Sequence, residues 1–168
     1  MAARHVVLMG LMGSGKTSIG APLAERLGRP FLDNDVALQR RAGRTAREIA
    51  ATDGTDALHD EEAAAVLDAL ATLEPAVIGA AASTIESPKV RDALREHFVV
   101  WLDTDLDVLA HKLARKEHRP EVTGSPREFL ERQRDRRGPL LRDVASLVIG
   151  SDRSDDAGTV ERIVRAVR

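Results

Sequence analysis

The chain has 168 residues, of which 43% are hydrophobic and 31% charged, and its formal net charge at pH 7 is −2. This composition fits one globular domain over residues 1–168 and argues against disordered, collagen-like and membrane proteins. Only 2% of the residues are aromatic and none is cysteine, which argues against base-stacking surfaces and excludes disulfides and thiolate metal sites. Because no stretch resembles a signal peptide or a spanning helix, we expect a cytoplasmic protein without a membrane partner.

Short apolar runs alternate with stretches of helical periodicity along the chain. The runs lie at residues 6–9, 76–79, 98–102 and 147–149. Continuous runs of this length are typical of strands that are buried on both faces of a sheet. Strands that alternate with helices imply right-handed crossovers and a mainly parallel sheet, so we predict a three-layer α/β/α domain.

Several helix-start signals lie between these runs. Thr45 with Glu48 and Ser125 with Glu128 both match the capping box, and Pro88 suits a first helical position. We expect helices over residues 18–27, 36–41, 56–73 and 105–116. In the third of these, one face would carry Leu58, Val66, Ala69, Leu70 and Leu73.

The segment at residues 117–124 shows neither the helical nor the strand period. It contains Pro120 and Gly124, which predicts a surface loop between two helices. This loop is either a plain connector or a functional lid, at about residues 117–125, that uses His118 and Arg119.

The strongest motif follows the first predicted strand. The segment Gly10-Leu-Met-Gly-Ser-Gly-Lys-Thr17 fits the eight-residue P-loop pattern and leads into a predicted helix. Its glycines let backbone N–H groups point inward, and the helix N-terminus adds a positive dipole, which together form a nest for phosphate oxygens. Lys16 is placed to reach the β- and γ-phosphates and the Thr17 hydroxyl to ligate Mg²⁺. We predict a site for ATP or GTP at Gly13, Ser14, Gly15, Lys16, Thr17 and Ser18.

Nucleotide binding alone does not separate a kinase from a GTPase or a motor. The chain has no base-reading Asn-Lys-x-Asp segment, and the residues before Gly54 do not form a switch Asp-x-x-Gly motif. Motor ATPases need a longer chain. These observations favour a small P-loop phosphotransferase.

Two carboxylates, Asp33 and Asp35, follow the apolar pair at residues 31–32. Their spacing of two places both side chains on the same side of a strand end, at the edge where α/β sheets bind ligands. One can hold hydrated Mg²⁺, and the other can accept the proton of an attacking hydroxyl. The alternative is that Asp35 only caps the helix expected at residues 36–41.

At this point the sequence resembles the shikimate kinase family over nearly its whole length. The matching segments, in order, are the P-loop at 10–17, Phe-Leu-Asp-Asn-Asp at 31–35, Thr-Asp-Gly at 52–54, His-Arg-Pro at 118–120 and Arg-Gly-Pro-Leu at 137–140. The resemblance implies a P-loop NTPase fold with a five-stranded parallel sheet and a lid, and ATP-dependent phosphorylation of the 3-hydroxyl of shikimate. The implied partner is a small-molecule hydroxyl acceptor, and we expect a monomer.

The resemblance also assigns roles to single residues. Lys16 and Thr17 would serve the phosphates and Mg²⁺, Asp33 would support the metal, and Asp35 would grip the acceptor hydroxyls. The remaining implied contacts are Arg119 as the lid arginine over the transferred phosphoryl group, Arg137 on the acceptor carboxylate, Glu62 as an orienting residue in the acceptor pocket, and Lys112 and Arg153 beside adenine.

Three departures from the family pattern concern the acceptor. The family has Phe-Arg where this chain has Leu58-His59, so a second carboxylate-binding arginine is absent; losing such a charged bond costs about 1.5–3 kcal/mol. The family's triple glycine is Gly79-Ala80-Ala81 here, which places methyl groups near the acceptor and would strain any residue at positive φ. A tyrosine of the family is Leu141.

The nucleotide side of the pattern is therefore complete, whereas the acceptor side is altered. Three hypotheses follow: a shikimate kinase in which Arg44 or Arg47 compensates, a related kinase for another small polyol or hydroxy acid, and an ATP-binding pseudokinase with a regulatory role. We expect the acceptor pocket to involve Asp35, His59, Gly79, Ala80, Ala81 and Arg137.

Other charged residues have ordinary interpretations. Six arginines lie within residues 127–142, but acidic residues alternate with them at helical spacings, so we expect a charge-laced helix and no nucleic-acid partner. His5, His97 and His111 lack metal spacing and are expected on the surface or at caps. Glu86, Asp92 and Glu96 are expected on a solvated helix face.

Overall fold

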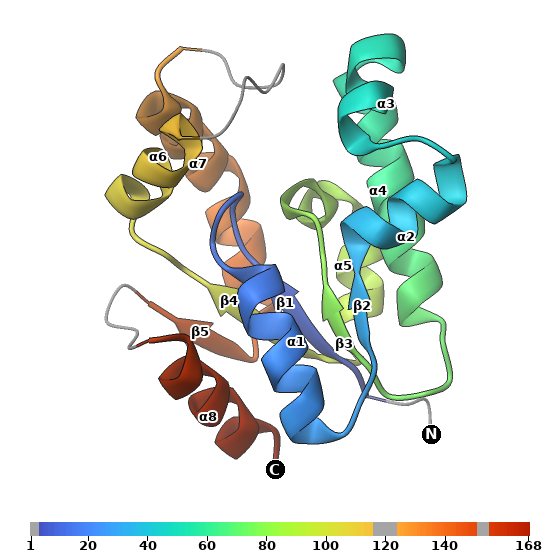
Figure 1. Cartoon of the computed structure of the whole chain (residues 1–168), viewed down its shortest axis with the longest axis vertical. Coiled ribbons are helices and arrows are strands. Elements are labelled where there is room, and N and C mark those ends of the chain that lie inside the picture. The colour runs from blue at the N-terminus through green and yellow to red at the C-terminus, as the bar shows by residue number, and fades with distance from the viewer. Residues whose placement is uncertain (1–3, 116–123, 151–154) are drawn as a thin grey trace.

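A computed structural model of the protein describes residues 4–115, 124–150 and 155–168 (Figure 1). Strands and helices alternate through most of the chain. In order they are β1 (Val6–Met9), α1 (Lys16–Leu27), β2 (Phe31–Asp33), α2 (Asn34–Ala42), α3 (Ala46–Asp53), α4 (Thr55–Leu70), β3 (Val77–Gly79), the 3₁₀ helix η1 (Ala82–Glu86), α5 (Pro88–Leu94), β4 (Phe98–Leu102), α6 (Leu106–Ala114), α7 (Pro126–Val144), β5 (Leu147–Ile149) and α8 (Asp156–Val167).

All five strands form one parallel sheet in the order β2-β3-β1-β4-β5. The apolar run at 6–9 lies in the centre of this sheet, where strands have neighbours on both sides. The runs at 98–102 and 147–149 form strands with the predicted bounds, and the run at 76–79 begins one residue before β3. The predicted α/β fold with five parallel strands is confirmed.

Alternate residues of the central strand contact two separate helical layers. Val6 and Leu8 pack in a core cluster with residues of α1 and α8, whereas Val7 and Met9 pack in a second cluster with residues of α4, α5 and α7. This division follows from the period of two along a strand. Helices thus cover both faces of the sheet, and the groups α2–α4 and α6–α7 extend beyond the carboxyl ends of the strands (Figure 1).

All four predicted helices form, but several of their bounds were wrong: α1 begins two residues earlier than expected, and α6 ends at Ala114. The helix expected over 56–73 ends at Leu70, and Leu73 is 88% exposed in the turn before β3. The helix expected over 36–41 begins already at Asn34, because Asp33 accepts hydrogen bonds from the N–H groups of Asp35 and Val36 and thereby caps it. The capping box of Thr45 and Glu48 is confirmed.

His5 and His97 are buried against each other, so the expectation of surface or cap positions was wrong for both. The backbone N–H of His5 donates to Nδ1 of His97 at 3.1 Å, and Nδ1 of His5 accepts from the N–H of Ala76 at 3.1 Å. Burial is the main cause that lowers the pKa of His97, and the nearby His5 adds to it. The pair joins the ends of β1, β3 and β4 at the edge opposite the P-loop.

Within the three described ranges, no helix combines the length and the apolar composition that crossing a bilayer requires.

Candidate active site

The P-loop connects β1 to α1 with a backbone that requires glycine. Gly15 has φ 98° and precedes α1, and the N–H of Ile19 donates to its carbonyl at 2.9 Å. At Gly10, an added Cβ would lie 2.5 Å from the Ser14 hydroxyl oxygen and 2.9 Å from the carbonyl oxygen of Leu102. Neither contact is compatible with a larger residue, so the loop requires glycine at position 10 in order to pack against the end of β4.

Lys16 is held at the mouth of this loop by backbone acceptors. Its Nζ donates to the carbonyl of Gly10 at 2.7 Å and to that of Leu11 at 3.3 Å. Burial lowers the pKa of Lys16 to about 8, and the carboxylate of Asp35 is the leading opposing cause. A phosphate anion in the loop would add negative charge and so favour the protonated side chain.

Thr17 and Asp33 present adjacent oxygen atoms at the end of the P-loop. The Thr17 hydroxyl donates to Oδ2 of Asp33 at 3.1 Å, while Oδ1 of the same carboxylate accepts from the N–H of Asp35 at 2.9 Å. The helix cap is therefore Asp33, and the alternative in which Asp35 caps α2 was wrong. Asp35 instead lines the cleft described next.

A cleft of about 1150 Å³ runs from the P-loop between the helical groups beyond the strand ends. Its lining includes all six predicted P-loop residues at 13–18 and also Asp35. One wall comes from α4 and carries Asp56, His59 and Glu62; the other comes from α7 and carries Phe129, Gln133, Arg136 and Arg137. Nucleotide and acceptor residues predicted from distant segments thus share one cavity.

Arg137 is a buried cationic side chain of the cleft. Its side chain is 8% exposed, and its Nε and Nη2 donate to Oε2 of Glu86 at 3.1 and 3.0 Å. Burial lowers the pKa of Arg137, and the charge of Glu86 is the leading cause that opposes this. Glu86 lies at the end of η1 and lines the cleft, so its expected place on a solvated helix face was wrong.

Arg136 is a second arginine of the cleft, which sequence reasoning missed. Its Nη1 lies 3.5 Å from Oε1 of Glu86. The proposed compensating residues do not take this place: Arg44 is paired with Asp53 at 2.7 Å, and neither Arg44 nor Arg47 lines the cleft. Two adjacent arginines at 136 and 137 could have indicated a site with two cations. The sequence alone does not tell, however, which side of this helix faces the cleft.

The Gly-Ala-Ala segment contributes to the cleft only through Ala81. Ala80 is completely buried in the core, its N–H donates to the carbonyl of Leu8 at 3.1 Å, and neither it nor Gly79 lines the cleft. Ala81 has φ −62°, so the methyl groups bring no left-handed strain. Next to this segment, Ser83 donates to Oε1 of the buried Glu62 at 3.2 Å.

The other altered positions divide between core and cleft. Leu58 lines the cleft and packs with Leu38 and Ile49, whereas Leu141 is buried under the sheet and does not line the cleft. Leu141 is therefore a core residue, contrary to its expected place on the acceptor side.

Lys112 lies beside the P-loop, with its Nζ donating to the carbonyl of Gly13 at 3.2 Å. This placement suits the predicted nucleotide contact. Arg119, Arg153 and residues 117–123 of the lid predicted at about 117–125 lie outside the described residues.

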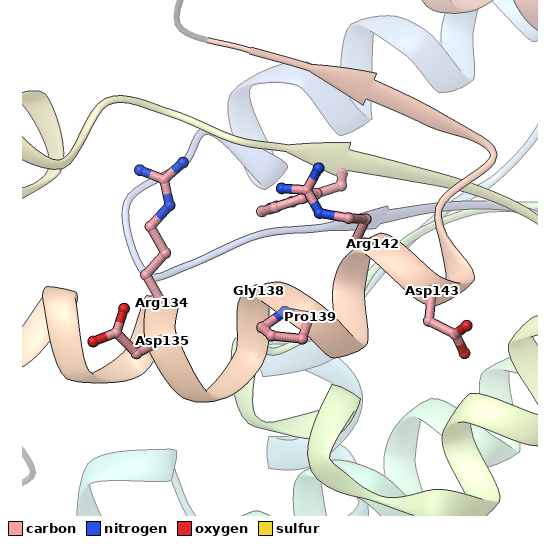
Figure 2. A pocket seen from close by; sticks show the side chains of 7 residues that line it. Arg134, Asp135, Gly138, Pro139, Arg142 and Asp143 are labelled. Atoms are coloured by element: carbon pink, nitrogen blue, oxygen red, sulfur yellow. The ribbon is translucent and has the colours of Figure 1, made fainter.

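The outer side of α7 borders a second, shallower hollow of about 690 Å³ (Figure 2). There the guanidinium of Arg142 lies 5.6 Å from the centre of the Trp101 ring, and Arg134 pairs with Asp103 at 3.1 Å. Arg127 pairs with Glu131 four residues later, as the charge pattern predicts. The arginines of α7 thus face different sides of the helix: Arg136 and Arg137 share Glu86 in the cleft, whereas Arg134 and Arg142 border the other hollow.

Comparison with known proteins decides the family. A family model described as shikimate kinase matches residues 12–168. The chain belongs to the shikimate kinase family. A curated shikimate kinase from Cereibacter sphaeroides is 39% identical over 167 residues, which cover 98% of this chain and 81% of that protein.

Solved structures agree with this assignment. A shikimate kinase from Acinetobacter baumannii in complex with shikimate matches with a TM-score of 0.91 at 27% identity, covering 98% of this chain and 93% of that one. A gluconokinase from Sinorhizobium meliloti 1021 matches with a TM-score of 0.65 at 26% identity, covering 97% and 88%. Members of the shikimate kinase family are phosphotransferases that act on a hydroxyl group, which confirms the preference for a kinase over a GTPase.

Proposed function

We propose that this shikimate kinase family member transfers the γ-phosphoryl group of ATP to the 3-hydroxyl of shikimate. The observation that carries the proposal is the single cleft that joins the P-loop, Asp35 and Arg137. This arrangement offers a phosphate nest, a carboxylate for a hydroxyl and a buried cation for a carboxylate. The shikimate-bound relative with the same fold supports the same acceptor class.

The nucleotide phosphates would occupy the P-loop, with Lys16 facing the β- and γ-phosphates. Thr17 and Asp33 are the residues that would hold Mg²⁺, because their oxygens are adjacent and oxygen-only ligands suit this ion. Bound Mg²⁺ would neutralise charge on the phosphate oxygens. Lys112, whose Nζ lies beside the carbonyl of Gly13, would also contact the nucleotide.

Asp35 would orient the acceptor hydroxyl and accept its proton. The hydroxyl oxygen forms a bond to the γ-phosphorus as the bond from that phosphorus to the bridging oxygen breaks, and ADP leaves with the electron pair. Lys16 would offset the charge that develops on the transferred group, since Asp35 and the phosphates keep it protonated.

Arg137 would bind the acceptor carboxylate, with His59 on the facing wall in place of a second arginine. The predicted roles of Arg119 over the phosphoryl group and of Arg153 near adenine remain predictions, as do a monomeric state and a cytoplasmic location. Glu86, which already engages Arg137, specifically favours one alternative: an acceptor with no carboxylate, such as a small polyol.

The test is an acceptor screen with Mg²⁺-ATP, in which ADP release and the phosphorylated product are both quantified. Shikimate, quinate and neutral polyols are compared side by side. We expect shikimate to stimulate ADP release and to give shikimate 3-phosphate in equal amount. A Lys16→Ala protein prepared in parallel measures contaminating host kinase. No stimulation by millimolar shikimate, with stimulation by a polyol, would replace the proposed acceptor; no stimulation by any acceptor would favour a pseudokinase.

A further inference from the structure

We propose that Glu86 determines acceptor specificity by competing, as an internal carboxylate, for the guanidinium edge of Arg137 that an acidic acceptor needs. The inference rests on the proposed function, because it takes Arg137 as the acceptor's carboxylate site. It concerns a residue outside every motif that defined the family resemblance.

The contact between the two side chains has the geometry of carboxylate recognition. One oxygen of Glu86 accepts from both Nε and Nη2 of Arg137, at 3.1 and 3.0 Å. These two N–H groups form one of the two edges through which a guanidinium binds carboxylates. An acceptor carboxylate that approaches the same edge would have to displace Glu86.

The exposures of the partners favour Glu86 as the side chain that exchanges. Arg137 is 8% exposed and comes from a turn of α7 within the protein, whereas Glu86 is 28% exposed and borders the cleft. Exchange by rotation of the Glu86 side chain would return its carboxylate to solvent. The same movement by Arg137 would remove the cation from the site.

The backbone at Glu86 is anchored, so that only the side chain is free to exchange. Arg91 donates to the carbonyls of Ile85 and Glu86 at 2.8 and 2.9 Å. The next residue, Ser87, caps α5 by accepting from the N–H of Val90. These local bonds hold the Glu86 side chain close to Arg137 and give it a high effective concentration there.

Arg136 adds a second cationic contact to the Glu86 carboxylate. Its Nη1 lies 3.5 Å from the second oxygen of Glu86, so the carboxylate is placed between two guanidinium groups. When Glu86 is displaced, both cations would become available to the acceptor. Arg136 and Arg137 would then bind the acceptor carboxylate together, because His59 on the facing wall carries no permanent charge.

The experiment compares wild type with Glu86→Gln at saturating Mg²⁺-ATP, using shikimate and its uncharged methyl ester as acceptors. We expect the shikimate KM of the variant to fall about 5- to 30-fold, the range for losing one partly exposed charged competitor, with kcat within about twofold. The KM for the ester should not fall. Glu74→Gln, at an exposed position before β3, is the control for a change of net charge.

An unchanged or raised shikimate KM in Glu86→Gln would overturn the inference, because Glu86 would then only support Arg137. A fall in KM for both acceptors alike would also overturn it. Glu86→Asp, which retracts the carboxylate by one methylene, should give an intermediate KM and replaces the first variant if that one does not fold.

Calorimetric titration of shikimate in the presence of ADP separates this inference from the proposed function. If wild type neither binds nor phosphorylates shikimate but Glu86→Gln binds it, the inference holds and the proposed acceptor is wrong. If wild type phosphorylates shikimate and the variant behaves identically, the function holds and the inference fails. Absence of binding to both proteins contradicts both.

Discussion

The two halves of the cleft are built in different ways. The nucleotide half consists mainly of consecutive residues 10–18, whose shape depends on glycine backbone geometry, with Asp33 and Lys112 in contact with this segment. The acceptor half takes single side chains from α4, η1 and α7, and its central contact joins residues 51 positions apart. A locally encoded site keeps its form as a unit, whereas a site assembled from distant side chains can change acceptor preference through single substitutions.

Asp35 lies where the halves meet, so its replacement tests whether they form one catalytic site. We expect Asp35→Asn to reduce kcat about 10³-fold, because a positioned general base contributes about 10² to 10⁴. ATP binding should persist, because the P-loop residues are unchanged and the bound phosphates themselves favour protonated Lys16. Turnover and nucleotide titration are measured on the same preparation, with Asp92→Asn, at an exposed position of α5, as control. Wild-type turnover in the variant would mean that another group accepts the proton.

Arg137→Gln tests the acceptor half alone. We expect kcat/KM for shikimate to fall about 10- to 150-fold, because a charged hydrogen bond worth about 1.5–3 kcal/mol is lost, while the KM for ATP stays unchanged. Arg134→Gln is the matched control, because Arg134 comes from the same helix but lines the other hollow (Figure 2). Its guanidinium pairs with Asp103. If both variants lose acceptor affinity equally, the effect belongs to the fold of α7 and not to Arg137.

His59→Arg asks whether the altered wall limits acceptor binding. We expect the shikimate KM to fall about 3- to 10-fold, because a permanent cation on α4 would face the carboxylate from the side opposite Arg137. The gain should be larger in the Glu86→Gln background, in which no internal carboxylate competes for the new arginine. An unchanged or raised KM in both backgrounds would show that the carboxylate is held away from this wall.

The same contrast explains how much could be predicted from the sequence. The strand runs and the P-loop were predicted because each depends on residues adjacent in the chain, through burial on both strand faces and through backbone conformation. The family resemblance directed attention to Asp35, His59 and Arg137; these residues share the cleft, and their roles in it stay predictions.

Residues whose role depends on distant partners were misplaced. Glu86 was assigned to solvent because an isolated glutamate on a helix is ordinarily exposed, and its partner is 51 residues away. His5 and His97 are 92 residues apart and meet only when β1 and β4 pair. Leu141 was assigned to the acceptor side by analogy, but the phase of α7 directs it into the core.

Replacing a residue of the buried histidine pair has the smallest expected effect, a change in how stability depends on pH. Measuring it separates acid effects on the fold from acid effects on acceptor binding. The pKa of His97 is lowered by burial, by His5 and by Arg4, against an opposing effect of Glu96. The unfolded chain therefore binds more protons than the folded one as pH falls below the ordinary value of 6.5, so the stabilisation present above that pH is lost in acid.

His97→Asn retains a side-chain acceptor for the N–H of His5 but cannot titrate. We expect it to lose less stability than wild type between pH 7 and 5, which would appear as a smaller fall in Tm over this range. Melting curves at each pH, with exposed His111→Asn as control, measure this difference. Equal acid sensitivity in all three proteins would place the titrating group elsewhere. If this difference is found, the shikimate KM is measured over the same pH range in wild type and in His97→Asn. A change in KM that persists in the variant then arises from the cleft and not from the histidine pair.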